Sequence, residues 1–268
     1  MWYFNLTLTR LFDVILAPFR WWPPGGLLLV SALTGVLMLL IFKRVSNQAR
    51  IRRAKDLIKA HILALRLFRD EPGVLMASQR QVLRANLTYL RYAVLPIIFI
   101  LPPVVLIMVQ LNLRYGEAPA RVGHPVVVTA AFNQALDDGV ALTAPAGVRV
   151  ETEALRAAYD NEASWRVRPV AAAVYTLRVQ SRGRVYEKEL AAGGGGTARL
   201  SSRRVRGWWA QLTNPGERPL EGDLREIRVQ YEPRRNTVFG LAVPWVITFF
   251  VASLVAAFAL KGVLRAEI

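Results

Sequence analysis

Residues that could carry covalent chemistry are few in this sequence. Its 268 residues include two histidines, His61 and His124, and no cysteine. The HExxH pattern of zinc proteases, the GxSxG nucleophile motif and the phosphate-binding P-loop do not occur. Four consecutive glycines at 193–196 lack the Lys-Ser/Thr that ends a P-loop, so they are interpreted as a flexible connection. We therefore predict no catalytic residue, no metal site and no cofactor, and a protein that is not an enzyme.

One cluster combines basic and aromatic side chains. Arg203, Arg204 and Arg206 are followed directly by Trp208 and Trp209. Such a cluster can stack on nucleic acid, contact lipid headgroups or pack within its own domain. The net charge of +16 fits nucleic acid or an anionic membrane surface. Because 53% of the residues are hydrophobic, the membrane is favoured, with these five residues at the headgroups.

The first uncharged apolar run, residues 25–42, is close to the ~20 residues that cross a hydrocarbon core of ~30 Å. Trp21 and Trp22 precede it, as in an interfacial aromatic belt, and Lys43 and Arg44 follow it. We predict a transmembrane helix with both tryptophans at the headgroups. The alternative, a cleaved signal peptide, would need a small-residue cleavage site after the run.

Two further apolar runs are predicted to span the membrane. Residues 93–113 contain Pro96, Pro102 and Pro103, which membrane helices tolerate and which predict a kink. Residues 238–260 carry no charge, and Pro244 lies near their start.

The charge of the loop between the first two runs predicts the orientation. Residues 43–92 hold twelve Lys and Arg against three Asp and Glu, a net charge of +9. Short basic loops stay in the cytoplasm. The N-terminus and residues 114–236 are therefore expected outside and the C-terminus inside, in a multi-pass protein of a prokaryotic inner (plasma) membrane.

The segments between the runs have their own patterns. Apolar residues at helical spacing before Pro24 predict an amphipathic helix in the outer interface, or a short helix packed on the outer domain. Ile51, Ile58 and His61 begin a heptad-like seam, and the sequence DEPG at 70–73 breaks it. We predict a basic cytoplasmic coiled-coil hairpin, continuous at both ends with a membrane helix.

The outer segment alternates apolar and polar residues, as half-buried strands do. Hairpin turns are predicted at Ser181-Arg182-Gly183 and at Asp137-Asp138-Gly139. About 120 residues of this kind predict an immunoglobulin-like β-sandwich. The expected strands are residues 126–129, 148–151, 165–170, 175–180, 184–190 and 227–231.

The order of these parts resembles the YidC/Oxa superfamily of membrane-protein insertases, particularly its short three-span relatives. The resemblance lies in residues 12–24, in residues 34–90, which include FKRVSNQARIRRAKDLIKAHILALRLFRD, and in the third span. It implies a polar groove that thins and wets the bilayer locally. The residues placed in that groove are Ser31, Thr34, Asn47, Gln48, Thr248 and Ser253. It also implies that a hydrophobic client or a ribosome contacts Arg50, Arg52, Arg53, Lys55 and Lys59.

Two functions follow from this interpretation. The first is an insertase-like or assembly factor with chaperone activity in protein transport. The alternative is a structural or scaffolding subunit that binds other membrane subunits through its β domain. The fold class is a three-span α-helical membrane core with a cytoplasmic hairpin and an extracytoplasmic β domain. The predicted order is 1–24 interfacial helix, 25–43 span, 44–92 hairpin, 93–113 span, 114–236 β domain, 237–261 span and 262–268 tail.

Overall fold

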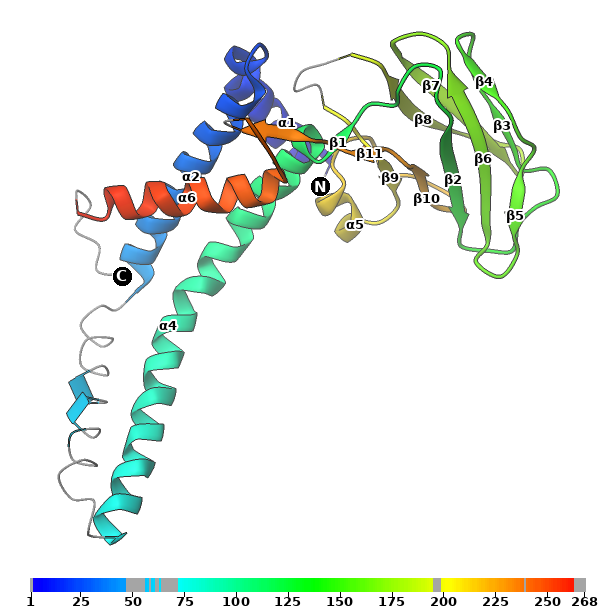
Figure 1. The fold of residues 1–268 in the computed structure, drawn as a ribbon. Coiled ribbons are helices and arrows are strands. Elements are labelled where there is room, and N and C mark those ends of the chain that lie inside the picture. Colours follow the sequence, from blue (N-terminus) through cyan, green and yellow to red (C-terminus); the bar gives the residue numbers. More distant parts are fainter. Residues whose placement is uncertain are drawn as a thin grey trace. The chain divides into compact units, whose positions relative to one another are not determined.

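The computed structural model describes residues 2–46, 56–57, 59–60, 63, 72–194, 199–238 and 240–262 (Figure 1). The chain forms two compact units. One contains Met1–Leu28 and Leu106–Phe249, and the other contains Leu29–Val105 and Phe250–Ile268. The predicted combination of helices with β-sheets is confirmed.

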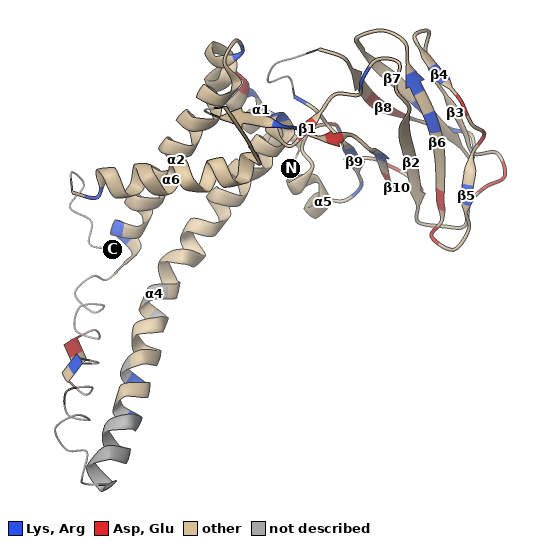
Figure 2. Cartoon of the chain, viewed as in Figure 1, with Lys and Arg blue, Asp and Glu red and all other residues tan. Residues whose placement is uncertain are grey.

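Among the described residues, two helices are long and apolar enough to cross a membrane, α2 (Pro23–Val45) and the Val82–Tyr115 part of α4 (Pro72–Tyr115). The two prolines that open α2 cost little there, because the first helical N–H groups have no partner within the helix. Lys43 and Arg44 close α2 in its last turn, where cations complement the carbonyl ends. In Figure 2 both helices are tan over their apolar stretches.

Helix α4 joins the second arm of the predicted hairpin to the second predicted span without a break. Pro96, Pro102 and Pro103 lie inside it, so the expectation that this run tolerates prolines is confirmed. The predicted kink stays a prediction, and most of the first hairpin arm lies outside the described residues.

The third apolar run differs from its prediction of one helix over 238–260. Strands β12 (Asn236–Val238) and β13 (Leu241–Val243) pair as an antiparallel hairpin, and helix α6 begins only at Trp245. Gly240, with φ of +82°, permits the turn, and Pro244 suits the start of a helix. Helix α6 (Trp245–Leu260) has 16 residues and is followed by a turn at 261–262. Its length is about 24 Å, less than a typical hydrocarbon core.

Residues 126–229 form two larger sheets. One sheet has the order β4-β6-β2-β10-β9 with β5 also beside β6, and the other has the order β3-β7-β8. All pairings within both sheets are antiparallel. The strands are β2 (Val126–Phe132), β3 (Ala141–Thr143), β4 (Val148–Val150), β5 (Leu155–Ala157), β6 (Glu162–Pro169), β7 (Ala173–Ser181), β8 (Arg184–Ala192), β9 (Arg203–Val205) and β10 (Leu224–Val229). A strand was observed at each of the six predicted places. Two short strands, β1 (Glu117–Ala118) and β11 (Glu232–Pro233), pair with each other.

The two sheets share one hydrophobic core. Val128, Trp165 and Ile227 come from the first sheet, and Leu177 and Leu190 come from the second. All five side chains are at most 3% exposed. Alternation along each strand directs them inward, and a fully buried residue of this kind contributes about 1.5–3 kcal/mol.

The two predicted turns have different outcomes. Ser181 pairs with Arg184, and Arg182 and Gly183 between them both have positive φ, as in a type I′ hairpin. Asp137-Asp138-Gly139 does form a turn, but the predicted hairpin is wrong. Strands β2 and β3 on either side belong to different sheets. Asp-Gly pairs indicate a turn without deciding which strands pair. Of the glycines at 193–196, the described residues include only the first two.

Candidate functional site

Helix α1 (Trp2–Leu16) buries a stripe that is half polar and half apolar. Its buried residues are Asn5, Thr9, Phe12 and Leu16, spaced three or four apart on one face. Large apolar residues of the same helix are exposed: Tyr3, Phe4, Leu11 and Val14. A helix on a water-soluble domain normally turns its large apolar residues inward, so these four exposed side chains depart from that pattern. The helix packs on the protein through polar and apolar groups and offers an apolar face to its surroundings. Its predicted place, in the outer interface or on the outer domain, stays a prediction.

Arg114, in the last turn of α4, contacts Thr9 and Asp13 in the middle of α1. Its guanidinium is 1% exposed and donates to the carbonyl oxygens of Gln110 (2.8 Å) and Thr9 (3.1 Å). It also pairs with the carboxylate of Asp13, which is half-exposed, and lies 5.8 Å from the ring centre of Phe12. A buried guanidinium is tolerated only when its donors are satisfied. The cluster therefore fixes α1 against the end of α4.

Further hydrogen bonds close the same junction. The Tyr115 hydroxyl donates to the carbonyl of Pro23 (3.0 Å), which ties the end of α4 to the start of α2. A Cβ added to Gly26 would come within 2.9 Å of that hydroxyl, so any side chain at this position would have to displace it. Asn236 donates to the carbonyl of Tyr115 (3.0 Å), and Arg234 donates to that of Arg114 (2.8 Å). The chain leaving the β domain is thus bound to the end of α4.

Helix α5 (Trp208–Thr213) connects α1 with the β domain. Asn5 donates to the carbonyl of Gln211 (2.8 Å), and the Gln211 side chain donates to the carbonyl of Glu217 (2.7 Å). Trp208 and Trp209 stack with ring centres 4.0 Å apart and are 55% and 66% exposed. Exposed indoles are typical of a membrane interface.

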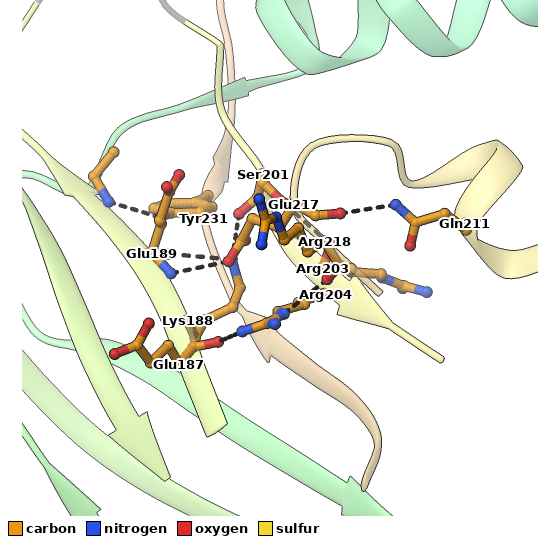
Figure 3. A network of polar contacts seen from close by, with 11 residues as sticks. Glu187, Lys188, Glu189, Ser201, Arg203, Arg204, Gln211, Glu217, Arg218 and Tyr231 are labelled. Carbon is orange, nitrogen blue, oxygen red and sulfur yellow. Dashed lines mark hydrogen bonds and ion pairs between the residues drawn. The ribbon is translucent and has the colours of Figure 1, made fainter. Parts of the chain in front are cut away.

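A buried ion pair continues this connection into the sandwich (Figure 3). Lys188 on β8 is completely buried and pairs with the carboxylate of Glu217. It also donates to the carbonyl of Ser201 at 2.7 Å. Glu217 accepts the backbone N–H of Glu189 at 3.1 Å. Burial lowers the pKa of Lys188, and the nearby carboxylate of Glu217 opposes that shift.

Two of the three arginines predicted at the headgroups donate hydrogen bonds within the β domain. Arg204 donates to the carbonyls of Arg218 (2.8 Å) and Glu187, and Arg206 donates to that of Gly222. Arg203 is exposed. A guanidinium has five donors, so these bonds leave capacity for a phosphate. Contact with headgroups stays a prediction for these residues and for Trp21 and Trp22, which are 83% and 46% exposed.

Of the predicted groove residues, three lie in the unit that contains most of α2 and α6. Ser31, Thr34 and Ser253 are at most 3% exposed. Thr34 donates to the carbonyl of Val30 (2.7 Å), and Ser253 donates to that of Phe250 (3.0 Å). A Cβ on Gly35 would overlap the carbonyl group of Ser253, so α2 and α6 cross at small residues.

The remaining predicted residues are placed only in part. Thr248 is 8% exposed and belongs to the unit of the β domain. Asn47 and Gln48, like Arg50, Arg52, Arg53 and Lys55, lie outside the described residues. Lys59 is described and is exposed. The groove and the client surface both stay predictions. Over the described ranges, no three His, Cys, Asp or Glu residues lie together as metal ligands would.

The buried charges were not predicted, although a signal for one was present. Asn5, Thr9 and Asp13 recur every four residues in an apolar segment, and this spacing indicates a polar face that needs a partner. Arg114 looked like an ordinary flank of the second apolar run. Lys188 alternates with apolar Tyr186 and Leu190 on the inward side of its strand, which is the pattern of a buried position.

The chain matches no protein-family model, no curated protein and no solved structure.

Proposed function

We propose that the chain is a non-enzymatic membrane-protein assembly factor of insertase type, related to the YidC/Oxa superfamily, in a prokaryotic inner membrane. Helices α2 and α4 cross the bilayer, and α6 is a third, shorter span. Because α1 is bonded to the end of α4 and to α5, the N-terminus and the β domain lie on the same side. The charge of the 43–92 loop supports placing that side outside.

The strand order supports an immunoglobulin-like type for the β domain. Immunoglobulin sandwiches have one sheet ordered A-B-E-D and another ordered C-F-G. With β2 taken as strand B, the sheets here read D-E-B for β4-β6-β2 and C-F-G for β3-β7-β8. Strand β10 occupies the position of strand A.

The observation that carries the insertase proposal is the length of α6. This uncharged helix is bounded on both sides by residues that are not helical, and about 24 Å is too short for an undisturbed bilayer. A short span is accommodated by thinning of the bilayer around it. Thinner hydrocarbon lowers the cost of moving a polar segment across, which is what an insertase has to achieve.

The basic hairpin provides the approach for a client. Helix α4 runs from Pro72 through Arg80 and Arg84 into the apolar stretch. A client or a ribosome, whose RNA is anionic, would be attracted to the basic arms and led to the short span.

Reconstitution tests the proposal directly. The full chain is placed in phosphatidylcholine vesicles, and a client with one apolar segment and a short polar tail is added outside. Wild-type protein should increase the amount of tail protected from external protease several-fold over empty vesicles.

Four leucines inserted between Ala256 and Ala257 lengthen α6 by about 6 Å and should return protection to the empty-vesicle level. The matched control, Ala256→Leu with Ala257→Leu, keeps the length and should keep the activity. Equal protection with wild-type and lengthened chains would contradict the proposal.

A second function, a scaffolding subunit, is favoured by the junction around Arg114. That junction joins the β domain to α1 and α4 through buried and partly buried hydrogen bonds. A scaffolding subunit needs such a junction to keep its binding domain at a fixed distance from the membrane. Purification in mild detergent separates the two functions. One stoichiometric membrane complex would favour the scaffold, whereas nascent chains or ribosomal proteins would favour the insertase.

A further inference from the structure

A pocket of about 440 Å³ lies beside the Arg114 junction, between the end of α1 and strand β8. Its volume is within the range of small-molecule sites. Three arginines, Arg20, Arg114 and Arg199, and two carboxylates, Asp13 and Glu189, line it. Leu16, Val174 and Leu200 supply apolar walls. Glu189 and Tyr231, drawn in Figure 3, stand at its border.

Two of the three arginines of this pocket are available to a ligand. Arg20 and Arg199 are exposed, and neither side chain has a hydrogen-bond or ion-pair partner within the part of the chain that the structure describes. The buried guanidinium of Arg114 is different, because Thr9, Gln110 and Asp13 already accept from it. Two uncommitted guanidinium groups in one pocket fit a phosphate group, which each can bind with two parallel N–H bonds.

The two carboxylates limit which phosphate-containing ligands the pocket can bind. Asp13 is half-exposed and uses Oδ1 for Arg114, and Glu189 is exposed. A ligand that is only anionic would be repelled by both. A ligand that joins a phosphate to an ammonium group would meet charges of opposite sign at both ends. An ammonium with three N–H donors also satisfies carboxylates better than a quaternary ammonium, which has none.

The place of the pocket in the chain suits a lipid. Arg20 immediately precedes the exposed Trp21 and Trp22, and α2 begins at Pro23. Arg114 lies in the last turn of the second candidate span, and the Tyr115 hydroxyl bonds to Pro23. The start of one span and the end of the other therefore meet at the pocket, which is at headgroup depth if both cross the bilayer.

We propose that this pocket binds the phosphoethanolamine headgroup of a phospholipid. The phosphate lies between Arg20 and Arg199, the ammonium donates to Asp13 and Glu189, and the first acyl carbons contact the apolar walls. The inference rests on the membrane-spanning part of the proposed function and is independent of insertase activity. The lipid would hold α1 and the β domain at a fixed depth.

Native mass spectrometry of the detergent-purified full chain tests the site. Phosphatidylethanolamine, phosphatidylcholine and phosphatidylglycerol with identical acyl chains are added in equal amounts. We expect one phosphatidylethanolamine to be retained at least about tenfold more than either competitor, since one charge-assisted hydrogen bond is worth about this ratio. Equal retention of phosphatidylcholine, or preference for phosphatidylglycerol, would overturn the proposal.

Variants and a soluble probe complete the test. Arg20→Gln with Glu189→Gln changes exposed side chains without partners to lose, so folding should be kept while the preference disappears. Arg178→Gln with Glu187→Gln removes an exposed ion pair elsewhere on the sheet and should keep the preference. O-phosphoethanolamine and inorganic phosphate distinguish a lipid from a free ligand. Displacement of bound lipid only by millimolar O-phosphoethanolamine supports a headgroup site, whereas saturable binding of inorganic phosphate without lipid would overturn it.

Discussion

Arg114 and Asp13 form an ion pair across 101 residues of sequence, and only the aspartate reaches solvent, with side-chain exposures of 1% and 49%. The arginine closes the second candidate span, and the aspartate belongs to the helix before the first. Their pairing, with the bonds from Arg114 to Thr9 and Gln110, binds the N-terminal helix to the base of the β domain. Both segments must then lie on one side of any membrane that α2 and α4 cross.

Replacing Arg114 by methionine should loosen this junction. The substitution removes the donors to Thr9, Gln110 and Asp13, so two buried carbonyls each lose one hydrogen bond and the Asp13 carboxylate loses its cation. We expect a loss of about 2–4 kcal/mol, which is below the cost for a fully buried pair because Asp13 can be hydrated. Two measurements test this loss of stability. The thermal unfolding midpoint in detergent should be lower, and trypsin should cleave faster after Arg10. Arg121→Met, which removes a pair with Glu232 that is 69% exposed on both sides, should change neither.

The crossing of α2 and α6 should tolerate no side chain at position 35. Gly35→Leu places carbon atoms where the carbonyl group of Ser253 lies, and overpacking of this kind costs about 1–3 kcal/mol. The detergent-solubilised variant should unfold at a lower temperature and aggregate on size-exclusion chromatography. Ala259→Leu, on an exposed part of α6, introduces the same side chain and should behave like wild type. Equal stability of both variants would mean that the two helices do not pack here.

Glu117, just after α4, should make stability depend on pH. Burial raises the pKa of its carboxyl above 4.5, although Ser202 and the charges of Arg203 and Lys188 oppose the shift. A raised folded-state pKa adds stability that is complete below 4.5 and is lost as pH rises through the raised value. Glu117→Gln mimics the protonated form. It should match the wild-type midpoint at pH 4 and exceed it by up to about 3 °C at pH 7.

Scanning calorimetry between pH 4 and pH 8 measures that difference. Glu153→Gln is the control, because its side chain is exposed, and its midpoint should follow wild type throughout. If Glu117→Gln is less stable than wild type at pH 7, the carboxylate is stabilising and the sign of the argument is wrong.

Local patterns in the sequence were sufficient for most of the elements. Alternation found the six main strands, and the Arg182-Gly183 hairpin followed from its turn residues. Apolar length found α2 and the apolar part of α4. Each of these depends on neighbours within a few residues, where periodicity and turn chemistry act directly.

Features that depend on distant partners could not be predicted in this way. The uncharged run 238–260 satisfies any hydropathy window, yet Gly240 and Pro244 divide it into a hairpin and a short helix. Asp137–Gly139 is a turn whose flanking strands pair with strands far along the chain. Lys188 and Glu217 become an ion pair only when β8 and the loop after α5 pack together.

The β domain should fold when separated from the spans. Its two sheets share a core to which none of α2, α4 and α6 contributes a residue among those described. Residues 117–235 expressed alone should be soluble, monomeric and β-rich by circular dichroism. Lys188→Met in this domain leaves the carboxylate of Glu217 buried without its cation, which costs about 3–5 kcal/mol. Lys188→Met with Glu217→Leu should recover much of that loss. A disordered or helical spectrum of the unmodified domain would contradict its autonomy.

The orientation in the membrane should be visible by labelling single cysteines, which can be introduced freely because the chain has none. Tyr159→Cys lies on the β domain at a position that is 98% exposed, and Ser78→Cys lies on the basic hairpin. The +9 charge of the 43–92 loop predicts that the hairpin is cytoplasmic. An impermeant maleimide added to intact spheroplasts should therefore label Tyr159→Cys at once and Ser78→Cys only after the membrane is opened. Trp2→Cys, on the helix bonded to the β domain, should follow Tyr159→Cys.

Labelling of Ser78→Cys in intact spheroplasts would reverse the topology and place the β domain in the cytoplasm. Labelling of all three would mean that α2 and α4 do not cross the membrane.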